Sequence, residues 1–185
     1  FSRFMELALY APGLGYYSAG RQKFGAAGDF VTAPELGPLF ARCLARPCMQ
    51  VLTTLSNADI LEAGAGSGAL AADLLHELEA LGGLPRNYFI LELSAELRAR
   101  QAQTLKLKVP HLFDRVRWLE TLPAKGFRGV VLGNELLDAM PVERFRMTAA
   151  GLQQLQVDWQ EDKFIWRERS ADAALQRRIG ALCLP

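Results

Sequence analysis

The stretch from Ile60 to Leu70 constrains this chain more than any other part of it. It places an apolar run and a carboxylate before three glycines at alternate positions and a helix-forming segment. Glycine adopts positive φ freely and lets a ligand approach the backbone. The first N–H groups of a helix are free to face such a ligand. The stretch therefore predicts the first strand of an α/β sheet, turning tightly into a helix beneath a nucleotide-like cofactor.

The glycines alone do not identify the cofactor. Gly64, Gly66 and Ala69 also match the dinucleotide pattern G-x-G-x-x-G/A after a strand. Glu62 favours S-adenosylmethionine, because a carboxylate at the end of this strand would repel a pyrophosphate but attract an ammonium and a sulfonium. Glu62 could otherwise serve as a partner of the helix dipole. We expect S-adenosyl-L-methionine, with a nicotinamide-dependent oxidoreductase as the alternative.

Length and composition fit one globular domain. The 185 residues are 50% hydrophobic, with 21 basic and 20 acidic side chains and a formal net charge of +1. This balance gives no electrostatic footprint for nucleic acid. No apolar run approaches the length of a membrane span, and no signal peptide is visible in a chain that starts at Phe1. We therefore expect neither nucleic acid nor a membrane among the partners.

The cysteines do not suggest a metal site. Cys43, Cys48 and Cys183 form no C-x-x-C pair and are odd in number. They are expected to be buried thiols in a reducing compartment. No metal is therefore predicted.

The N-terminal part is expected to form a helix over residues 1–9 and then a glycine-rich loop. Thr32 and Glu35 have the spacing of a capping box, which predicts a helix start. The same stretch could place Asp29 and Thr32 on the rim of the cofactor pocket. Pro47 is expected to kink or end the helix that follows.

A second strand is predicted from Tyr88 to Leu93, almost continuously apolar as in a strand covered on both faces. Glu92 lies at its carboxyl end, where an acidic residue can accept both ribose hydroxyls of an adenosine. Glu92 could instead favour the positive end of the next helix. Ser94 is the expected N-cap of that helix.

Polar residues follow the last predicted parallel strand, residues 128–133. Asn134, Glu135 and Asp138 come just past its carboxyl end, where ligands of open α/β sheets bind. Glu135 could orient a guanidinium by paired hydrogen bonds, with Asp138 as the second choice. Asn134 could turn its amide toward the cofactor or cap a helix. Both carboxylates could alternatively be first-turn helix residues.

Beyond Val142 the pattern changes to the alternation of an antiparallel meander. We divide the chain into four segments: an N-terminal helical and loop extension over 1–56, a cofactor-binding core over 57–142, the meander over 143–169 and a helix over 170–185.

With these pieces assembled, the chain resembles the MidA-like methyltransferases, whose mitochondrial members are assembly factors of respiratory complex I. The matching segments run in order from Phe4 to Pro141: Gly15-Tyr16-Tyr17, the loop 28–35, the glycine segment 62–68, and Asn134-Glu135 with Asp138. The glycine segment alone is weak evidence. The Gly-Asp-Phe loop paired with the Asn-Glu loop is specific.

The resemblance implies a class I methyltransferase with a Rossmann-like sheet, dependent on S-adenosyl-L-methionine. It implies a protein substrate, in the mitochondrial case an arginine of a complex I subunit, and a location in the bacterial cytoplasm or the mitochondrial matrix. The cofactor-lining residues would be Glu62, Gly64, Gly66, Gly68 and Glu92 with Asp29 and Thr32, and the residues facing the methyl group would be Asn134, Glu135 and Asp138.

Family members continue for roughly as many residues again, so we expect this chain to hold the first four parallel strands of an incomplete sheet. A non-catalytic assembly module that keeps the fold is the other alternative.

Overall fold

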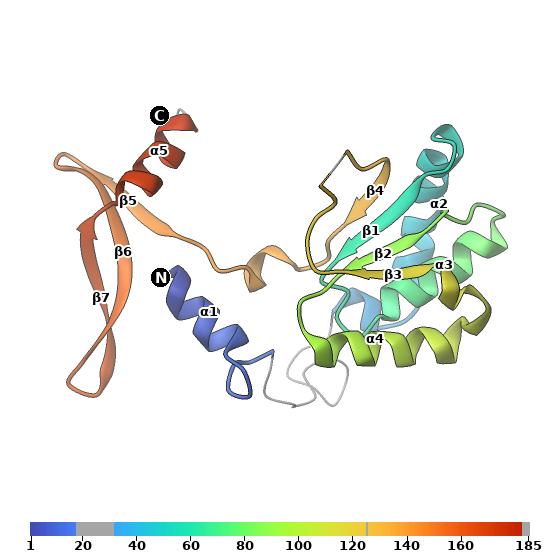
Figure 1. Ribbon diagram of the computed structural model, residues 1–185, viewed down its shortest axis with the longest axis horizontal. Helices are drawn as coiled ribbons and strands as arrows, with labels where there is room; N and C mark the ends of the chain where they lie inside the picture. The colour runs from blue at the N-terminus through green and yellow to red at the C-terminus, as the bar shows by residue number, and fades with distance from the viewer. Residues whose placement is uncertain (18–31, 125, 183–185) are drawn as a thin grey trace. The chain divides into compact units, whose positions relative to one another are not determined.

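The computed structural model describes residues 1–17, 32–124 and 126–182 of the chain. They belong to two compact units. The larger unit spans Gly20–Asp138, and the smaller one combines Phe1–Ala19 with Ala139–Pro185. Figure 1 labels the α-helices and strands of both units.

The larger unit is an α/β fold on a four-stranded parallel sheet in the order β3-β2-β1-β4 (Figure 1). Its strands are β1 (Asp59–Ala63), β2 (Tyr88–Leu91), β3 (Val116–Leu119) and β4 (Gly129–Leu132). Its helical elements are η1 (Ala33–Glu35), α2 (Leu39–Thr54), α3 (Ala69–Ala80), α4 (Ala95–Lys108) and η2 (Pro110–Arg115), where η marks a 3-10 helix. The short η3 (Leu137–Ala139) spans the boundary between the two units. The predicted Rossmann-like sheet of four parallel strands is confirmed.

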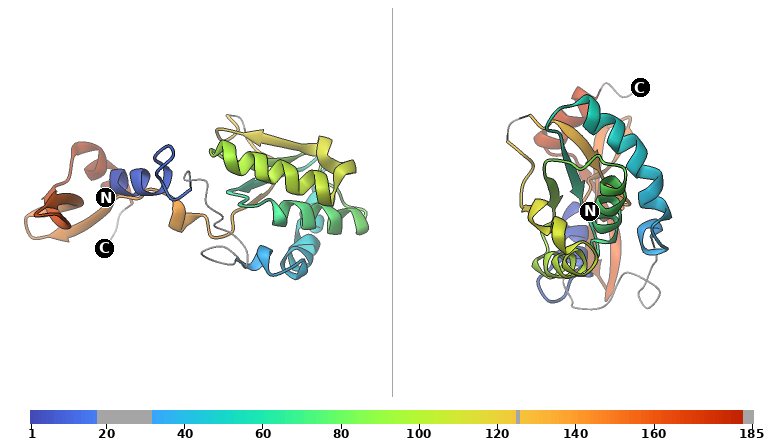
Figure 2. Two further views of the ribbon diagram at one scale, coloured as in Figure 1. Left: turned by 90° about the horizontal axis from the view of Figure 1, so that it is seen from below. Right: turned by 90° about the vertical axis from the view of Figure 1, so that its right-hand side faces the viewer.

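The hydrophobic core of this unit lies on one face of the sheet. The register aligns Ile60 with Tyr88 and Val130, and all three belong to or pack against this core. Helices α2, α3 and α4 supply its other side (Figure 2). In α3, Leu70, Leu74 and their neighbours at helical spacing are almost fully buried, as their periodicity predicts.

The opposite face of the sheet is less covered. Val131 is 62% exposed, and Phe89 and Leu91 are only half-buried. The expectation that the second strand is covered on both faces is therefore wrong for the described part of the chain, in which the packed helices lie on one face only.

Helix α2 runs through Pro47 without ending. The carbonyl that Pro47 leaves without a helical donor belongs to Cys43, an exposed residue. Cys48 is buried, so the expectation of buried thiols is confirmed for Cys48 and wrong for Cys43. Five residues span about 140° of turn on a helix, so the two thiols cannot both face the core. Cys183 lies outside the described residues.

The smaller unit contains the predicted antiparallel meander. Its sheet has the order β5-β6-β7. Its elements are α1 (Ser2–Tyr10), β5 (Arg144–Thr148), β6 (Gly151–Gln160), β7 (Lys163–Ser170) and α5 (Ala173–Ala181). Side-chain capping explains where α5 begins, because the carboxylate of Asp172 accepts the Leu175 N–H at 2.8 Å.

Aromatic contacts join α1 to the meander within this unit. The ring centroids of Phe1 and Trp166 are 5.4 Å apart, and those of Phe4 and Phe164 are 5.1 Å apart. Arg144 lies over the Phe1 ring at 5.4 Å. The first residues of the chain thus group with its last ones, and the division into 1–56, 57–142, 143–169 and 170–185 stays a prediction about domains.

Candidate functional site

The glycine loop, residues 64–68, joins β1 to α3. Gly64, Gly66 and Gly68 have φ angles of 68°, 54° and 82°, a backbone conformation that side chains rarely adopt. A Cβ on Gly64 would lie 2.9 Å from Cδ1 of Leu136, and one on Gly68 would lie 3.0 Å from Cα of Gln101. The loop is therefore packed too closely for larger residues. The predicted sharp turn from strand to helix is present, and its contact with a cofactor stays a prediction.

Glu62 is the next-to-last residue of β1, separated by one residue from the glycine loop, and is only 2% exposed. The hydroxyl of Tyr88 donates a hydrogen bond to Oε2 of Glu62 at 2.7 Å. Burial raises the pKa of Glu62 to about 7, although the bond from Tyr88 acts to lower it. Burial and the neighbouring Glu62 raise the pKa of Tyr88 well above its usual value. Glu62 therefore sits beneath the loop as a buried acid with no cation in hydrogen-bond contact among the described residues.

Glu92 follows β2 on the neighbouring side of the glycine loop. The strands align so that Gly64 N–H donates to the carbonyl of Leu91 at 3.0 Å. The carboxylate of Glu92 is nearly buried, at 9% exposure. Its Oε1 accepts the Ser94 N–H at 3.0 Å, and its Oε2 accepts the amide of Gln101 at 3.1 Å. Each oxygen keeps acceptor capacity for another donor.

Ser94 is the N-cap of α4, as predicted, because its hydroxyl accepts the Leu97 N–H at 3.3 Å. The bond from Ser94 N–H to Glu92 also supports the alternative role of Glu92 at the start of this helix. Both roles are compatible, since one oxygen serves the helix start and spare acceptor sites remain.

The predicted capping box at Thr32 and Glu35 is wrong. Residues Ala33–Glu35 form a 3-10 turn, and the Thr32 side chain makes no capping hydrogen bond. The carboxylate of Glu35 instead accepts a hydrogen bond from the hydroxyl of Ser67 in the glycine loop. This contact brings the η1 segment against the loop, close to where Thr32 was expected to line the pocket. Asp29 lies outside the described residues.

The loop after β4 lies on the other side of β1. Leu132 pairs with Glu62, and the side chain of Leu136 reaches the glycine loop at Gly64. Asn134 is half-buried, and Glu135 is exposed with φ of 49°, an unusual angle for a residue with a side chain. Strain of this kind clusters at functional sites.

Asp138 is exposed within the short η3 helix. Neither Glu135 nor Asp138 makes an ion pair with another described residue. The alternative role of the two as first-turn helix residues applies only to Asp138, because η3 begins at Leu137.

Of the predicted site residues, the structure brings Glu62, Glu92, Asn134 and Glu135 to one edge of the sheet. Glu92 flanks the glycine loop through β2, and Asn134 and Glu135 flank it through β4. Gln101, which the sequence did not single out, contacts the same loop. So does Glu35, for which the sequence predicted only a capping role. The signal for Gln101 was available: it is the one polar residue in the buried stripe of α4, between Leu97 and Leu105.

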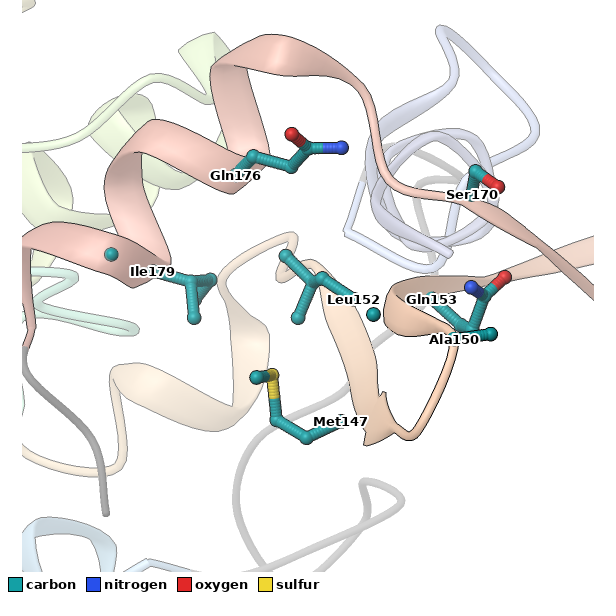
Figure 3. A pocket seen from close by; sticks show the side chains of 9 residues that line it. Met147, Ala150, Leu152, Gln153, Ser170, Gln176 and Ile179 are labelled. Carbon is teal, nitrogen blue, oxygen red and sulfur yellow. The ribbon is translucent and has the colours of Figure 1, made fainter.

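A hollow of about 420 Å³ lies in the smaller unit, between α5 and the turn that joins β5 to β6 (Figure 3). Its lining includes Met147, Leu152, Gln176 and Ile179, and no charged side chain is part of the described lining. It offers neither an acid nor a base for chemistry.

Residues 1–17, 32–124 and 126–182 contain no cluster of acidic, histidine and cysteine side chains able to hold a metal ion. Across the same residues, no helix combines the length and the apolar character needed to cross a membrane.

Comparison with known proteins agrees with this geometry. The model of a family described as S-adenosyl-L-methionine-dependent methyltransferases, Methyltransf_28, matches residues 43–181. Among solved structures, a COG1565 superfamily protein from Burkholderia thailandensis bound to S-adenosyl-homocysteine is 49% identical. It superposes with a TM-score of 0.83 over 99% of this chain and 49% of its own.

Curated relatives are more distant. Protein arginine methyltransferase NDUFAF7, mitochondrial, from Danio rerio is 28% identical over 85% of this chain and 42% of its own length. The Homo sapiens protein of the same name is 30% identical over 85% of this chain and 41% of its own length. The chain thus spans less than half the length of these relatives.

Proposed function

Because this chain belongs to the Methyltransf_28 family of S-adenosyl-L-methionine-dependent methyltransferases, we propose that it binds S-adenosyl-L-methionine at the glycine loop and serves methyl transfer. The single observation that carries this proposal is the pair of nearly buried carboxylates, Glu62 and Glu92, at the ends of adjacent strands beside a glycine loop with positive φ. The residues fit the cofactor. The loop leaves no room for a Cβ, and the acids beside it favour a cationic ligand over a phosphorylated one.

The cofactor side of the site consists of Glu62, the glycine loop and Glu92. Glu92 is our candidate for the ribose hydroxyls, because Ser94 and Gln101 already orient its carboxylate and leave acceptor sites free. Glu62 lies deeper, so its charge would act from beneath the loop rather than by exposure at the surface. Thr32 and Asp29 remain candidates for the pocket rim.

The acceptor side consists of the loop Asn134–Asp138. When bound, S-adenosyl-L-methionine supplies a methyl group on a sulfonium. The task left to the protein is to align the attacking atom with that group. Glu135 is our first candidate for holding the acceptor, Asp138 the second, and the Asn134 amide could face the cofactor. The exposure of Glu135 and the absence of a described ion-pair partner leave its carboxylate available.

A protein arginine is the acceptor we propose, because the curated relatives are named protein arginine methyltransferases. A carboxylate can accept two parallel hydrogen bonds from a guanidinium and so fix its plane. A subunit of respiratory complex I as the substrate, and the bacterial cytoplasm or the mitochondrial matrix as the location, stay predictions of the family resemblance.

The first experiment is calorimetric titration of the complete protein with S-adenosyl-L-methionine and, separately, with NAD. We expect binding of the first and none of the second. Glu92→Ala should raise the Kd about tenfold or more, since a charged acceptor for hydroxyl donors contributes about 1.5–3 kcal/mol. Glu79→Ala, which removes an exposed carboxylate of α3 away from the loop, is the matched control. Binding of NAD alone would overturn the methyl-donor assignment.

The acceptor side has its own test. Glu135→Ala should lower kcat/KM for methylation about 100-fold, because misplacing the acceptor by about 1 Å costs this much, and should leave the Kd for S-adenosyl-L-methionine unchanged. Glu161→Ala is the matched control, because Glu161 is also an exposed glutamate with positive φ but lies in the β6–β7 turn. Mass spectrometry of the methylated proteins identifies the residue that accepts the methyl group. Unchanged methylation by Glu135→Ala would point to Asp138 instead. Failure of the wild type to methylate any protein would point to a non-catalytic module.

A further inference from the structure

Gln101 is a buried polar residue in an otherwise apolar position. It is 0% exposed and lies in α4 one turn from Leu97 and one turn from Leu105, both of which face the core. Burying an amide costs free energy unless its groups find partners. A leucine would continue the stripe without this cost, so the local packing of α4 gives no reason for a glutamine here.

The partners of Gln101 are all identified. Its Nε2 donates to the carbonyl of Gly66 at 3.1 Å and to Oε2 of Glu92 at 3.1 Å. Its Oε1 accepts the indole N–H of Trp118 at 2.9 Å. An amide nitrogen has two donors, and both are used. The indole can only donate, so Trp118 fixes which end of the amide faces the site.

The two acceptors belong to the two halves of the proposed cofactor side. Gly66 is the middle of the glycine loop, and Glu92 is the carboxylate proposed for the ribose. The same amide group therefore sets the distance between a backbone carbonyl after β1 and a carboxylate after β2. A hydrogen bond from an amide to a carboxylate is charge-assisted, and such bonds are stronger than those between neutral groups.

The rest of α4 reinforces this link. One turn after Gln101, the hydroxyl of Thr104 donates to the carbonyl of Ser67 at 2.8 Å. A Cβ on Gly68 would come within 3.0 Å of Cα of Gln101, so the backbones of the loop and of α4 are closely packed. Two successive carbonyls of the glycine loop are thus held by side chains on one face of one helix.

We propose that Gln101 is a positioning residue for the cofactor, which holds the Glu92 carboxylate and the glycine loop at the spacing that an adenosine requires. This inference rests on the proposed function of the site. Gln101 acts through Glu92 and Gly66, and Trp118 acts through Gln101 by orienting its amide. If the side chain at position 101 only filled space, a leucine would serve equally well there.

The test compares Gln101→Leu with Gln103→Leu, the same substitution on the exposed face of the same helix. Calorimetry of the complete protein should show the Kd for S-adenosyl-L-methionine raised about tenfold or more by Gln101→Leu and changed less than about twofold by Gln103→Leu. Combined with Glu92→Ala, Gln101→Leu should add little further loss, because each change alone removes the contact between Gln101 and Glu92.

A pH profile separates positioning from packing. Gln101→Glu keeps the shape but places a second carboxyl against Glu92, and the introduced group can donate to Glu92 only when protonated. We expect its Kd to be several-fold closer to that of the wild type at pH 6 than at pH 8. Should Gln101→Leu fail to fold, Trp118→Phe decides: a rise of about threefold to tenfold in Kd supports the proposal, and no change overturns it.

The outcomes distinguish this inference from the function on which it rests. If the wild type does not bind S-adenosyl-L-methionine, the proposed function is rejected and this inference with it. If the wild type binds and folded Gln101→Leu binds equally well, only the positioning role of Gln101 is rejected.

Discussion

A buried acid lies near each end of β1, and the two acids differ in the charge of their hydrogen-bond partners. At the amino end, Asp59 is 5% exposed and forms a salt bridge of 2.6 Å with Arg86. Asn87 also donates to it through its backbone and its side-chain amide, both at 3.0 Å. At the carboxyl end, Glu62 is 2% exposed, and the one described side chain that donates to it is the neutral Tyr88.

The difference appears in the pKa of each group. Burial acts to raise the pKa of Asp59, but the hydrogen bonds from Arg86 and Asn87 and the charge of Arg86 outweigh it and hold the pKa below its usual value. Burial raises the pKa of Glu62 to about 7, because no cation offsets it. Asp59 is thus a completed structural ion pair. Glu62 is an acid at the ligand-binding edge of the sheet, and its burial without a neighbouring cation costs free energy. Such a group is typical of a functional site.

The largest expected effect comes from Glu62→Gln. A folded-state pKa above the unfolded value of 4.5 means that the contribution of Glu62 to stability is full below pH 4.5 and is lost as the pH rises to about 7. Relative to the wild type, Glu62→Gln should therefore gain stability with rising pH, by about 3 kcal/mol between pH 4.5 and 8. Urea unfolding at both pH values measures the difference.

Glu62→Gln should also lose affinity for S-adenosyl-L-methionine at pH 8, although its stability relative to the wild type is higher at pH 8 than at pH 4.5. A stability difference between Glu62→Gln and the wild type that stays flat from pH 4.5 to 8 would show that Glu62 is ionised throughout, like Asp59.

Asp59→Asn should have the opposite sign. The substitution removes the charge that Arg86 faces and replaces one acceptor oxygen by a donor. We expect a loss of about 2 kcal/mol in the free energy of unfolding at pH 7. Because the pKa of Asp59 is lowered, this loss should persist above the unfolded value of 3.8 and shrink as the pH falls below it. Urea unfolding at pH 3 and pH 7 measures it.

Cofactor binding provides the control for Asp59→Asn. Asp59 lies at the end of β1 away from the glycine loop. The Kd of Asp59→Asn for S-adenosyl-L-methionine should therefore stay within about twofold of the wild type under conditions where both proteins are fully folded. A large loss of binding without unfolding would mean that the two ends of the strand are not functionally separate.

Local sequence was sufficient for much of this site. The apolar run, the acid and the spaced glycines specify a strand, a tight turn and a helix within eleven neighbouring residues, Ile60–Leu70, and the positive φ angles of Gly64 and Gly68 follow from that geometry. The N-cap at Ser94 was likewise predictable, because its partner is three residues away.

Contacts between distant segments were not predictable in this way. Thr32 and Glu35 have the spacing of a capping box, but the carboxylate of Glu35 bonds to Ser67, 32 positions further on, and leaves the local bond unmade. Gln101 bridges to Gly66 across 35 positions. Such contacts depend on how α4 and η1 dock on the sheet, and the spacing of neighbouring residues carries no information about that docking.

Tyr88→Phe should give the smallest effect of the three substitutions on β1 and β2, about 1 kcal/mol. The Tyr88 hydroxyl donates to Glu62 and acts to lower its pKa. Its removal should therefore raise the pKa of Glu62 beyond its value of about 7 and move the pH-dependent loss of stability to higher pH. Unfolding curves from pH 5 to 9 locate the midpoint of that loss. Thr148→Val, which removes a hydroxyl that donates to the carbonyl of Gly151, controls for loss of a hydroxyl and should shift stability equally at all pH values. If the Tyr88→Phe midpoint stays where it is in the wild type, another group must set the protonation of Glu62.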